Sequence, residues 1–255
     1  MLTAEQRQTF DLRGLVKLPA AIPATDSGRM GDAVWSFLAE HRGIQRHDRT
    51  TWGVDRPTGF QPLTRSGGLD GIWSAPVADA VAALLGPADR QRRERGRLLI
   101  TFPQATAWTV PGDSWHFDYV PPDGTDPRAV QVFALLDDVR PHGGGTLVLT
   151  GSHRLVAAVG RSQEPRPRAV RAALATAHPW LADLWAPDEQ STPAEREDSF
   201  LKHPEPIHDV TVEVVEVTGR AGDVFLMHSD CFHAIAPNAL DRPRLMCTSL
   251  VTRRP

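Results

Sequence analysis

The chain has 255 residues, of which 41% are hydrophobic, and this is enough to bury a substantial core in one domain. The 28 basic and 31 acidic residues leave a net charge of −3, which predicts binding neither to nucleic acid nor to an anionic membrane surface. Two cysteines are too few for a disulfide framework, and the charged N-terminus and lack of a long apolar run predict no secretory signal and no membrane span; we expect a cytoplasmic protein.

Helical signals are concentrated near the N-terminus. Asp26 is a suitable N-cap for a segment that runs to about His41, in which Val34 and Leu38 share one face. The segment "SAPVADAVAALLG" has a proline near its start and Gly86 at its end, which is the usual asymmetry of helix ends. The N-terminal part is therefore predicted to be rich in helix.

Strand signals follow. Short runs of β-branched or alternating residues, bounded by Gly, Pro or Asp, are typical of strands. Such runs occur at 97–102, 129–138, 145–151, 209–217, 222–228 and 244–252. Helices followed by short strands predict an α+β, mostly β fold, in which an antiparallel sandwich or barrel has helices packed outside it.

A long excursion, residues 155 to 208, separates two of these strands. It is rich in Arg, Ala, Glu and Pro, and its middle part "PRAVRAALATAHPWLADLW" is typical of helix. Long excursions between strands of a compact domain are usually functional lids or mobile surface. We expect a helical insertion within a single domain of residues 1–255, and a lid is one of these two interpretations.

The stretch "DSWHFDYVPP" places His116 and Asp118 two residues apart. Residues i and i+2 of a strand point to the same face, so the imidazole and the carboxylate would lie side by side. Such a pair is more often a surface or hydrogen-bonded pair than half of a metal site, so a third ligand decides the matter. His228 and His233 are the candidates, and two histidines with one carboxylate would form the facial ligand set of non-haem Fe(II) oxygenases.

The open face of such a metal can accept a dicarboxylate, whose far end needs a planar and permanently charged partner. Arg242 and Arg244 both lie near the start of the last predicted strand, and strand parity favours Arg244. Cys231 lies between the two candidate histidines, and we expect it to be a buried, unreactive thiol.

Four stretches, in this order, resemble the phytanoyl-CoA dioxygenase-like family of Fe(II)- and 2-oxoglutarate-dependent dioxygenases. They are "WHFDY", "HGGGTLVLTGSHR", "GDVFLMHSDCFHAIAPN" and "DRPRLMCTSL". The opening "FDLRGLVKLPAAI" is also similar to the start of family members, so the resemblance spans nearly the whole chain. It implies a double-stranded β-helix, the jelly-roll-like or cupin-like barrel of this family, with the N-terminal helices wrapped around it.

In this family the distal iron ligand is the histidine that is followed by small residues and Asn, and the arginine for 2-oxoglutarate comes eleven positions later. These positions are His233 and Arg244 here. The resemblance implies that His116, Asp118 and His233 hold Fe(II), that Arg244 binds 2-oxoglutarate, and that O2 is the oxidant. Halogenating relatives have a small residue at the carboxylate position, so Asp118 implies hydroxylation or a related oxidation. We expect hydroxylation of a C–H bond in a small molecule, and a pocket lined by Trp, Phe and Ile would suit an apolar compound from specialised-metabolite biosynthesis.

The remaining contacts to the co-substrate are less well defined. Phe133 stands where the family has a tryptophan that lines the co-substrate pocket, and Ile235 stands where many relatives have a hydroxyl residue. Thr101, Thr146 and Ser249 are unranked candidates for the missing hydroxyl donor.

Four aromatic residues near the predicted ligands, Trp108, Trp115, Phe117 and Tyr119, are candidates for the walls of a substrate pocket, although aromatic residues equally fill cores. No basic cluster suited to a pyrophosphate is evident, so phytanoyl-CoA is not the expected substrate.

Three alternatives to hydroxylation stay open. The same cofactors could support desaturation, cyclisation or epoxidation. A zinc- or manganese-dependent cupin-type isomerase or hydrolase would use the same three ligands without a need for Arg244. A metal-free binding module would need none of these residues. Neither the substrate nor the oligomeric state follows from the sequence.

Overall fold

The computed structural model describes residues 1–104, 107–118, 127–160, 166–187 and 190–253. Its α-helices are α1 (Ala4–Arg13), α2 (Ala24–Arg42), α3 (Gln61–Arg65), α4 (Ala75–Leu85), α5 (Ser152–Gly160), α6 (Pro167–Ala177), α7 (Pro179–Leu184) and α8 (Pro193–Leu201). Its strands are β1 (Leu15–Leu18), β2 (Gln91–Arg93), β3 (Arg97–Thr101), β4 (Ala129–Leu135), β5 (Thr146–Thr150), β6 (Glu205–Ile207), β7 (Val210–Glu216), β8 (Val224–His228), β9 (His233–Ile235) and β10 (Arg244–Arg253). Three short 3₁₀ helices, η1 (Arg49–Thr51), η2 (Asp70–Ile72) and η3 (Ala88–Arg90), lie in the N-terminal part.

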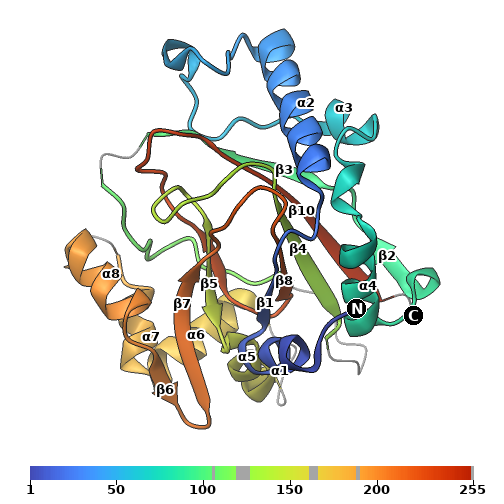
Figure 1. The fold of residues 1–255 in the computed structure, drawn as a ribbon. Coiled ribbons are helices and arrows are strands. Elements are labelled where there is room, and N and C mark those ends of the chain that lie inside the picture. The colour runs from blue at the N-terminus through green and yellow to red at the C-terminus, as the bar shows by residue number, and fades with distance from the viewer. Residues whose placement is uncertain (105–106, 119–126, 161–165, 188–189, 254–255) are drawn as a thin grey trace.

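The strands form two antiparallel sheets (Figure 1). The larger sheet has the order β1-β8-β4-β10-β2, with β3 also paired to β10, and the smaller sheet has the order β6-β7-β5-β9. One buried cluster joins the two sheets, with Phe133 and Met246 from the larger sheet and Val148 from the smaller one. The fold is the predicted double-stranded β-helix, although strand pairing among the described residues does not close the two sheets into a complete barrel.

Alternation along the strands sends side chains to two different cores. On β4, Val130 and Val132 belong to the buried cluster shared with the N-terminal helices, whereas Phe133 and Leu135 belong to the cluster between the sheets. This is the two-residue period from which the strands were predicted. All six predicted strands are confirmed, with ends that differ by at most a few residues.

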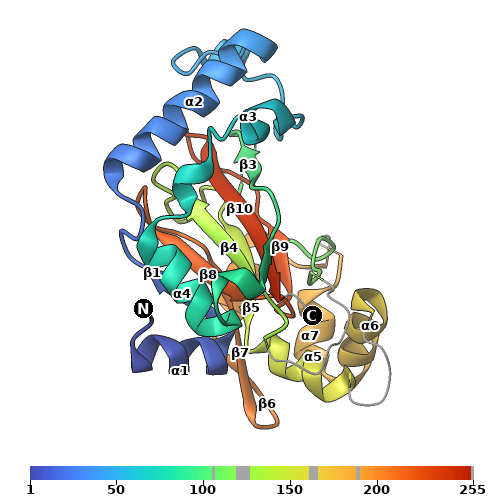
Figure 2. The same cartoon turned by 90° about the vertical axis from the view of Figure 1, so that its right-hand side faces the viewer.

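Helices cover the outer faces of the sheets (Figure 2). The N-terminal helices pack on the larger sheet, as predicted. The prediction that Asp26 caps α2 is wrong, because the helix begins at Ala24 after Pro23 and Asp26 lies inside its first turn. The carboxylate there still favours the helix, since its negative charge lies near the positive end of the helix dipole. No helix in the described ranges is long and apolar enough to span a bilayer.

The insertion is helical, as predicted, and it packs on the outer face of the smaller sheet. Leu174 of α6, Leu181 of α7 and Phe200 of α8 are buried in one cluster with Leu147 and Leu149 of β5. The role of the insertion as a lid remains a prediction.

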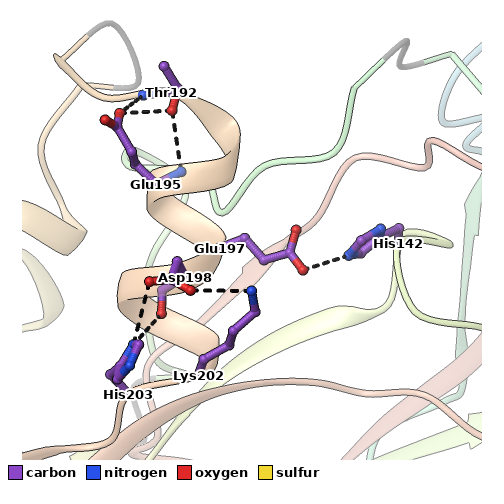
Figure 3. A network of polar contacts seen from close by, with 7 residues as sticks. All are labelled: His142, Thr192, Glu195, Glu197, Asp198, Lys202 and His203. Carbon is purple, nitrogen blue, oxygen red and sulfur yellow. Dashed lines mark hydrogen bonds and ion pairs between the residues drawn. The ribbon is translucent and has the colours of Figure 1, made fainter.

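Local polar contacts define both ends of α8 (Figure 3). Thr192 and Glu195 form a capping box, in which each side chain accepts a backbone N–H of the other residue. At the other end, Lys202 and His203 contact Asp198. Midway along the helix, Glu197 reaches His142 in the loop before β5, with Oε1 and Nε2 3.3 Å apart.

One buried arginine ties the insertion together. Nε of Arg196 donates to the carbonyl oxygen of Val110 at 2.6 Å, and its Nη atoms donate to those of Leu184 at 2.7 Å and Asp183 at 3.3 Å. The guanidinium of α8 thus joins two other segments, the loop at Val110 and the end of α7, through their carbonyl oxygens.

We predict that Arg196→Met lowers the free energy of unfolding by about 2–4 kcal/mol, because buried carbonyl groups lose charged donors. Urea denaturation followed by circular dichroism measures the change. Arg168→Met, at an exposed position of α6, is the matched control and should shift it by less than about 0.5 kcal/mol. Equal stability of the two variants would show that the guanidinium contributes nothing to the insertion.

Candidate active site

Three potential metal ligands meet at the edge of the smaller sheet. One ligand atom each from His116, Asp118 and His233 lies within 4.8 Å of the others. The two imidazole centroids are 4.3 Å apart. His116 is exposed, Asp118 is half-buried and His233 is buried, so the group is open to solvent on the His116 side.

Backbone pairing brings these residues together. The N–H of His116 donates to the carbonyl oxygen of His233 at 3.0 Å, and the N–H of His233 donates back at 2.7 Å. The N–H of Asp118 donates to the carbonyl oxygen of Ser229 at 3.1 Å. The stretch that carries His116 and Asp118 therefore extends the smaller sheet beyond β9, although as an isolated bridge and not as the regular strand that we expected.

Both histidines are held in one tautomer. Nδ1 of His116 lies 3.0 Å from the carbonyl oxygen of Ser114, and Nδ1 of His233 lies 3.1 Å from that of Cys231. A carbonyl oxygen can only accept, so each Nδ1 carries the hydrogen and each Nε2 keeps a free lone pair. This outer support is what metal-binding histidines usually have.

The electrostatic environment keeps His233 neutral. Burial lowers the pKa of its imidazole; Asp118 opposes this effect, while the nearby His116 adds to it. A neutral imidazole is the form that binds a metal. Two imidazole nitrogens and one carboxylate, with space left on one side, fit an Fe(II) ion of the facial-triad type.

Arg244 opens β10 and is buried, with polar partners that carry no charge. Its Nη2 donates to Oγ1 of Thr101 at 2.7 Å, and its Nη1 donates to Oγ1 of Thr146 at 3.4 Å. Its Nε is buried and has no hydrogen-bond partner. Burial lowers the pKa of the guanidinium to about 10, so it remains a cation at neutral pH, and the spare donor fits a carboxylate ligand.

Arg244 and the metal ligands are linked through the two sheets. Thr146 pairs with Ile235, which lies two residues after His233 on β9. The ring of Phe133, from the larger sheet, lies 6.4 Å from the imidazole of His233. Phe133 thus lies near the candidate ligand His233, and Thr146 connects the strand beside β9 to Arg244.

The structure separates the three candidate hydroxyl donors. Thr101 and Thr146 contact Arg244, whereas the hydroxyl of Ser249 donates to the carbonyl oxygen of Glu94 at 2.7 Å. Ser249 is therefore engaged elsewhere.

The aromatic residues predicted for a substrate pocket lie in another layer. Trp108, Trp115 and Phe117 are buried in the cluster between the smaller sheet and the insertion, on the side away from the metal ligands. Phe117 packs edge-on against Phe232, and Nε1 of Trp115 donates to a backbone carbonyl group. Tyr119 lies outside the described residues.

The remaining candidates behave as structural residues. His228 is not part of the ligand group, and its ring packs near those of Phe10 and His153. Burial raises the pKa of the Cys231 thiol to about 12, which agrees with the expectation of an unreactive thiol.

Sequence reasoning missed two residues that support the Arg244 pocket. Nδ2 of Asn238 donates to the carbonyl oxygens of Thr101 at 2.9 Å and Arg242 at 2.7 Å, and so ties β3 to the start of β10. Gly144 has a φ of +79°, and a Cβ there would lie 3.1 Å from Cβ of Asn238. The motifs "HGGGT" and "APN" are the signals that could have identified them. A run of glycines indicates a close approach of the backbone, and an Asn in a turn often binds nearby backbone groups through its side-chain amide.

The family model that matches this chain, together with its fold, identifies a non-haem iron enzyme that depends on 2-oxoglutarate. The chain belongs to the phytanoyl-CoA dioxygenase (PhyH) family, whose model matches residues 39–246. No curated protein sequence matches the chain.

Solved structures share the fold at low sequence identity. The α-ketoglutarate-dependent epimerase SnoN from nogalamycin biosynthesis is 18% identical, with a TM-score of 0.58 over 98% of this chain and 84% of that one. The carbocyclase SnoK from the same biosynthesis is 20% identical, with a TM-score of 0.55 over 100% and 87%. HygX from Streptomyces hygroscopicus, solved with nickel and 2-oxoglutarate bound, is 16% identical, with a TM-score of 0.55 over 99% and 88%.

We predict that Asp118→Asn weakens binding of Mn(II), a redox-stable substitute for Fe(II), by more than about tenfold, because the charged ligand of the group is lost. Isothermal titration calorimetry measures the affinity. Asp113→Asn removes an exposed carboxylate from the same stretch and should leave the affinity unchanged. If both variants bind Mn(II) like the wild type, the metal is held elsewhere.

Proposed function

We propose that this protein is an Fe(II)- and 2-oxoglutarate-dependent dioxygenase that hydroxylates an unactivated C–H bond of a small molecule in specialised-metabolite biosynthesis. The observation that carries the proposal is that the buried Arg244 has a spare donor and contacts Thr146. Thr146 lies on the strand next to β9, which carries His233 of the group of two histidines and one carboxylate. The solved structures of SnoN, in complex with Fe3+, α-ketoglutarate and nogalamycin RO, and of HygX, with nickel, 2-oxoglutarate and hygromycin B bound, support it.

In this proposal each residue of the chain has a defined task. His116, Asp118 and His233 hold Fe(II), and Arg244 binds the far carboxylate of 2-oxoglutarate with help from Thr101 and Thr146. Bound Fe(II), with 2-oxoglutarate and O2, supplies the oxidising power that an unactivated C–H bond requires.

The chain itself contributes orientation and exclusion of water. The Nδ1–H bonds of the two histidines hold their rings in place, so the ligand geometry exists before the metal binds. Phe133, Val148 and Met246 form an apolar wall between the sheets, which keeps water from the co-substrate.

Two of the structural neighbours favour a second candidate outcome. SnoN is an epimerase and SnoK is a carbocyclase, so this fold supports oxidations that do not end in hydroxylation. The same Fe(II) and 2-oxoglutarate site would then serve epimerisation, cyclisation, desaturation or epoxidation, and the way the substrate is held would select among them.

A cupin-type enzyme that binds a metal without 2-oxoglutarate is the main alternative in a different class. It would leave the spare donor of the buried Arg244 unexplained, since burial of an unpaired cation costs free energy unless a ligand uses it.

We predict that Fe(II) and 2-oxoglutarate, added together under anaerobic conditions, give a weak visible absorption band in the wild type. Arg244→Leu should weaken 2-oxoglutarate binding by at least about 100-fold, because a charge-assisted carboxylate contact is lost. The exposed neighbour Arg242 provides the matched control, Arg242→Leu, which should retain the band. Bound Fe(II) without a band at any 2-oxoglutarate concentration would instead favour the cupin-type alternative.

Product masses distinguish hydroxylation from the candidate outcomes that add no oxygen atom. We predict that incubation with a panel of glycosylated natural products, including nogalamycin-type and hygromycin-type compounds, yields a product that has gained one oxygen atom and depends on 2-oxoglutarate. High-resolution mass spectrometry measures this change. Loss of two hydrogen atoms would indicate desaturation or cyclisation, and a new isomer of unchanged mass would indicate epimerisation.

A further inference from the structure

A buried carboxylate, Glu216, lies at the end of β7 beside the Arg244 pocket. Its Oε1 accepts the backbone N–H of Gly145 at 3.0 Å, and its Oε2 accepts that of His142 at 2.8 Å. These two bonds fix both ends of the turn that leads into β5. The next residue along the chain is Thr146, whose hydroxyl contacts Arg244.

The packing at this turn is close. A Cβ on Gly145 would lie 2.8 Å from Cγ of Glu216 and 2.5 Å from the carbonyl oxygen of Val217. The carboxylate thus fills the space that glycine leaves free, and the turn cannot relax without moving it.

The charge on Glu216 is poorly compensated. Within the described part of the chain, no cation contacts its carboxylate, and no carboxylate contacts Arg244. Burial raises the pKa of Glu216 to about 7, and the two backbone donors and the more distant charges of His142 and Arg244 oppose this rise only in part. Glu216 and Arg244 therefore form a buried pair of opposite charges without direct contact.

Resting on the proposed function, we propose that Glu216 is a positioning residue for the co-substrate. It holds the turn that presents Thr146 to Arg244, and it takes up one proton when 2-oxoglutarate delivers its carboxylate to Arg244.

The direction of the effect follows from charge. The incoming carboxylate neutralises Arg244 and adds a negative charge to the same buried region, so it raises the pKa of Glu216. Binding is then linked to proton uptake, and the affinity for 2-oxoglutarate falls as the pH rises above about 7. Between pH 6.5 and 8.5 we expect a loss of affinity on the order of tenfold, because buried charges at such separations interact by about one pKa unit.

Other ionisable groups near this pair must be considered. The imidazole of His142 stacks on Trp108 and contacts Glu197 of α8 (Figure 3). Asp55 and Arg56 act on Arg244 from the N-terminal part, with opposite signs. Of these groups, His142 lies closest to the carboxylate, since its backbone N–H donates to Glu216, so it needs its own control.

The test is calorimetry of 2-oxoglutarate binding to the Mn(II)-loaded protein at pH 6.5, 7.5 and 8.5. Each titration is repeated in two buffers with different ionisation enthalpies, so the difference in heat counts the protons taken up. The wild type should take up about half a proton near pH 7.5, as a pKa rise of about one unit requires, and lose affinity as the pH rises. Both carboxyl groups of 2-oxoglutarate are ionised throughout this range, so they contribute no protons.

Glu216→Gln keeps an acceptor for the turn but cannot titrate. It should bind 2-oxoglutarate with little dependence on pH and without proton uptake. Glu213→Gln, on the same strand and ion-paired with Arg13, is the matched control and should behave as the wild type. His142→Asn removes the imidazole, and Asn tolerates the positive φ of 68° at this position, so it should also keep the pH dependence.

The outcomes separate this inference from the proposed function. If the Mn(II)-loaded wild type binds no 2-oxoglutarate at any pH, the proposed function fails. If it binds without proton uptake, the inference fails and the proposed function stands. Loss of the pH dependence in His142→Asn would overturn the inference by assigning the proton to the imidazole. The wild-type measurement is decisive even if Glu216→Gln does not fold, since absent uptake alone contradicts the proposal.

Discussion

The backbone bridge between His116 and His233 is the interaction on which the candidate site depends. Its two hydrogen bonds join segments that are far apart in the chain, and they set the separation of the two imidazole rings. Each ring is then oriented by the carbonyl oxygen of the residue two positions before it. The geometry of the candidate ligands is therefore a property of sheet pairing, which explains how an exposed histidine and a buried one come to lie side by side.

The two sheets divide the remaining tasks. The smaller sheet and the segment bridged to it carry the candidate metal ligands, whereas the larger sheet carries Phe133 and Arg244. The apolar cluster between the sheets fixes the distance between the candidate metal ligands and Arg244, and the helices on the outer faces bury the opposite sides of the same strands. Because core packing sets this distance, Arg244 and Glu216 can both be buried without forming a direct ion pair.

Strand prediction succeeded where the pattern was long enough to show its period. β4, β7 and β10 each have seven or more residues, and their alternation is visible in the sequence. β2, β6 and β9 have three residues each, which is too short to define a period. The start of α2 was misplaced because Ala24 and Asp26 are both compatible with a first turn, and only the observed backbone distinguishes them.

The sequence by itself determined which residue types are available at which spacing: the pair His116 and Asp118, the later histidine, and the arginine eleven positions beyond it. The number of residues between two positions is a property of the sequence alone, so this spacing is known without the fold. Only the tertiary structure decided that Thr101 and Thr146, and not Ser249, reach Arg244, and that the nearby aromatic residues face the insertion. These outcomes depend on which strands pair and which faces are buried, and long-range packing sets both.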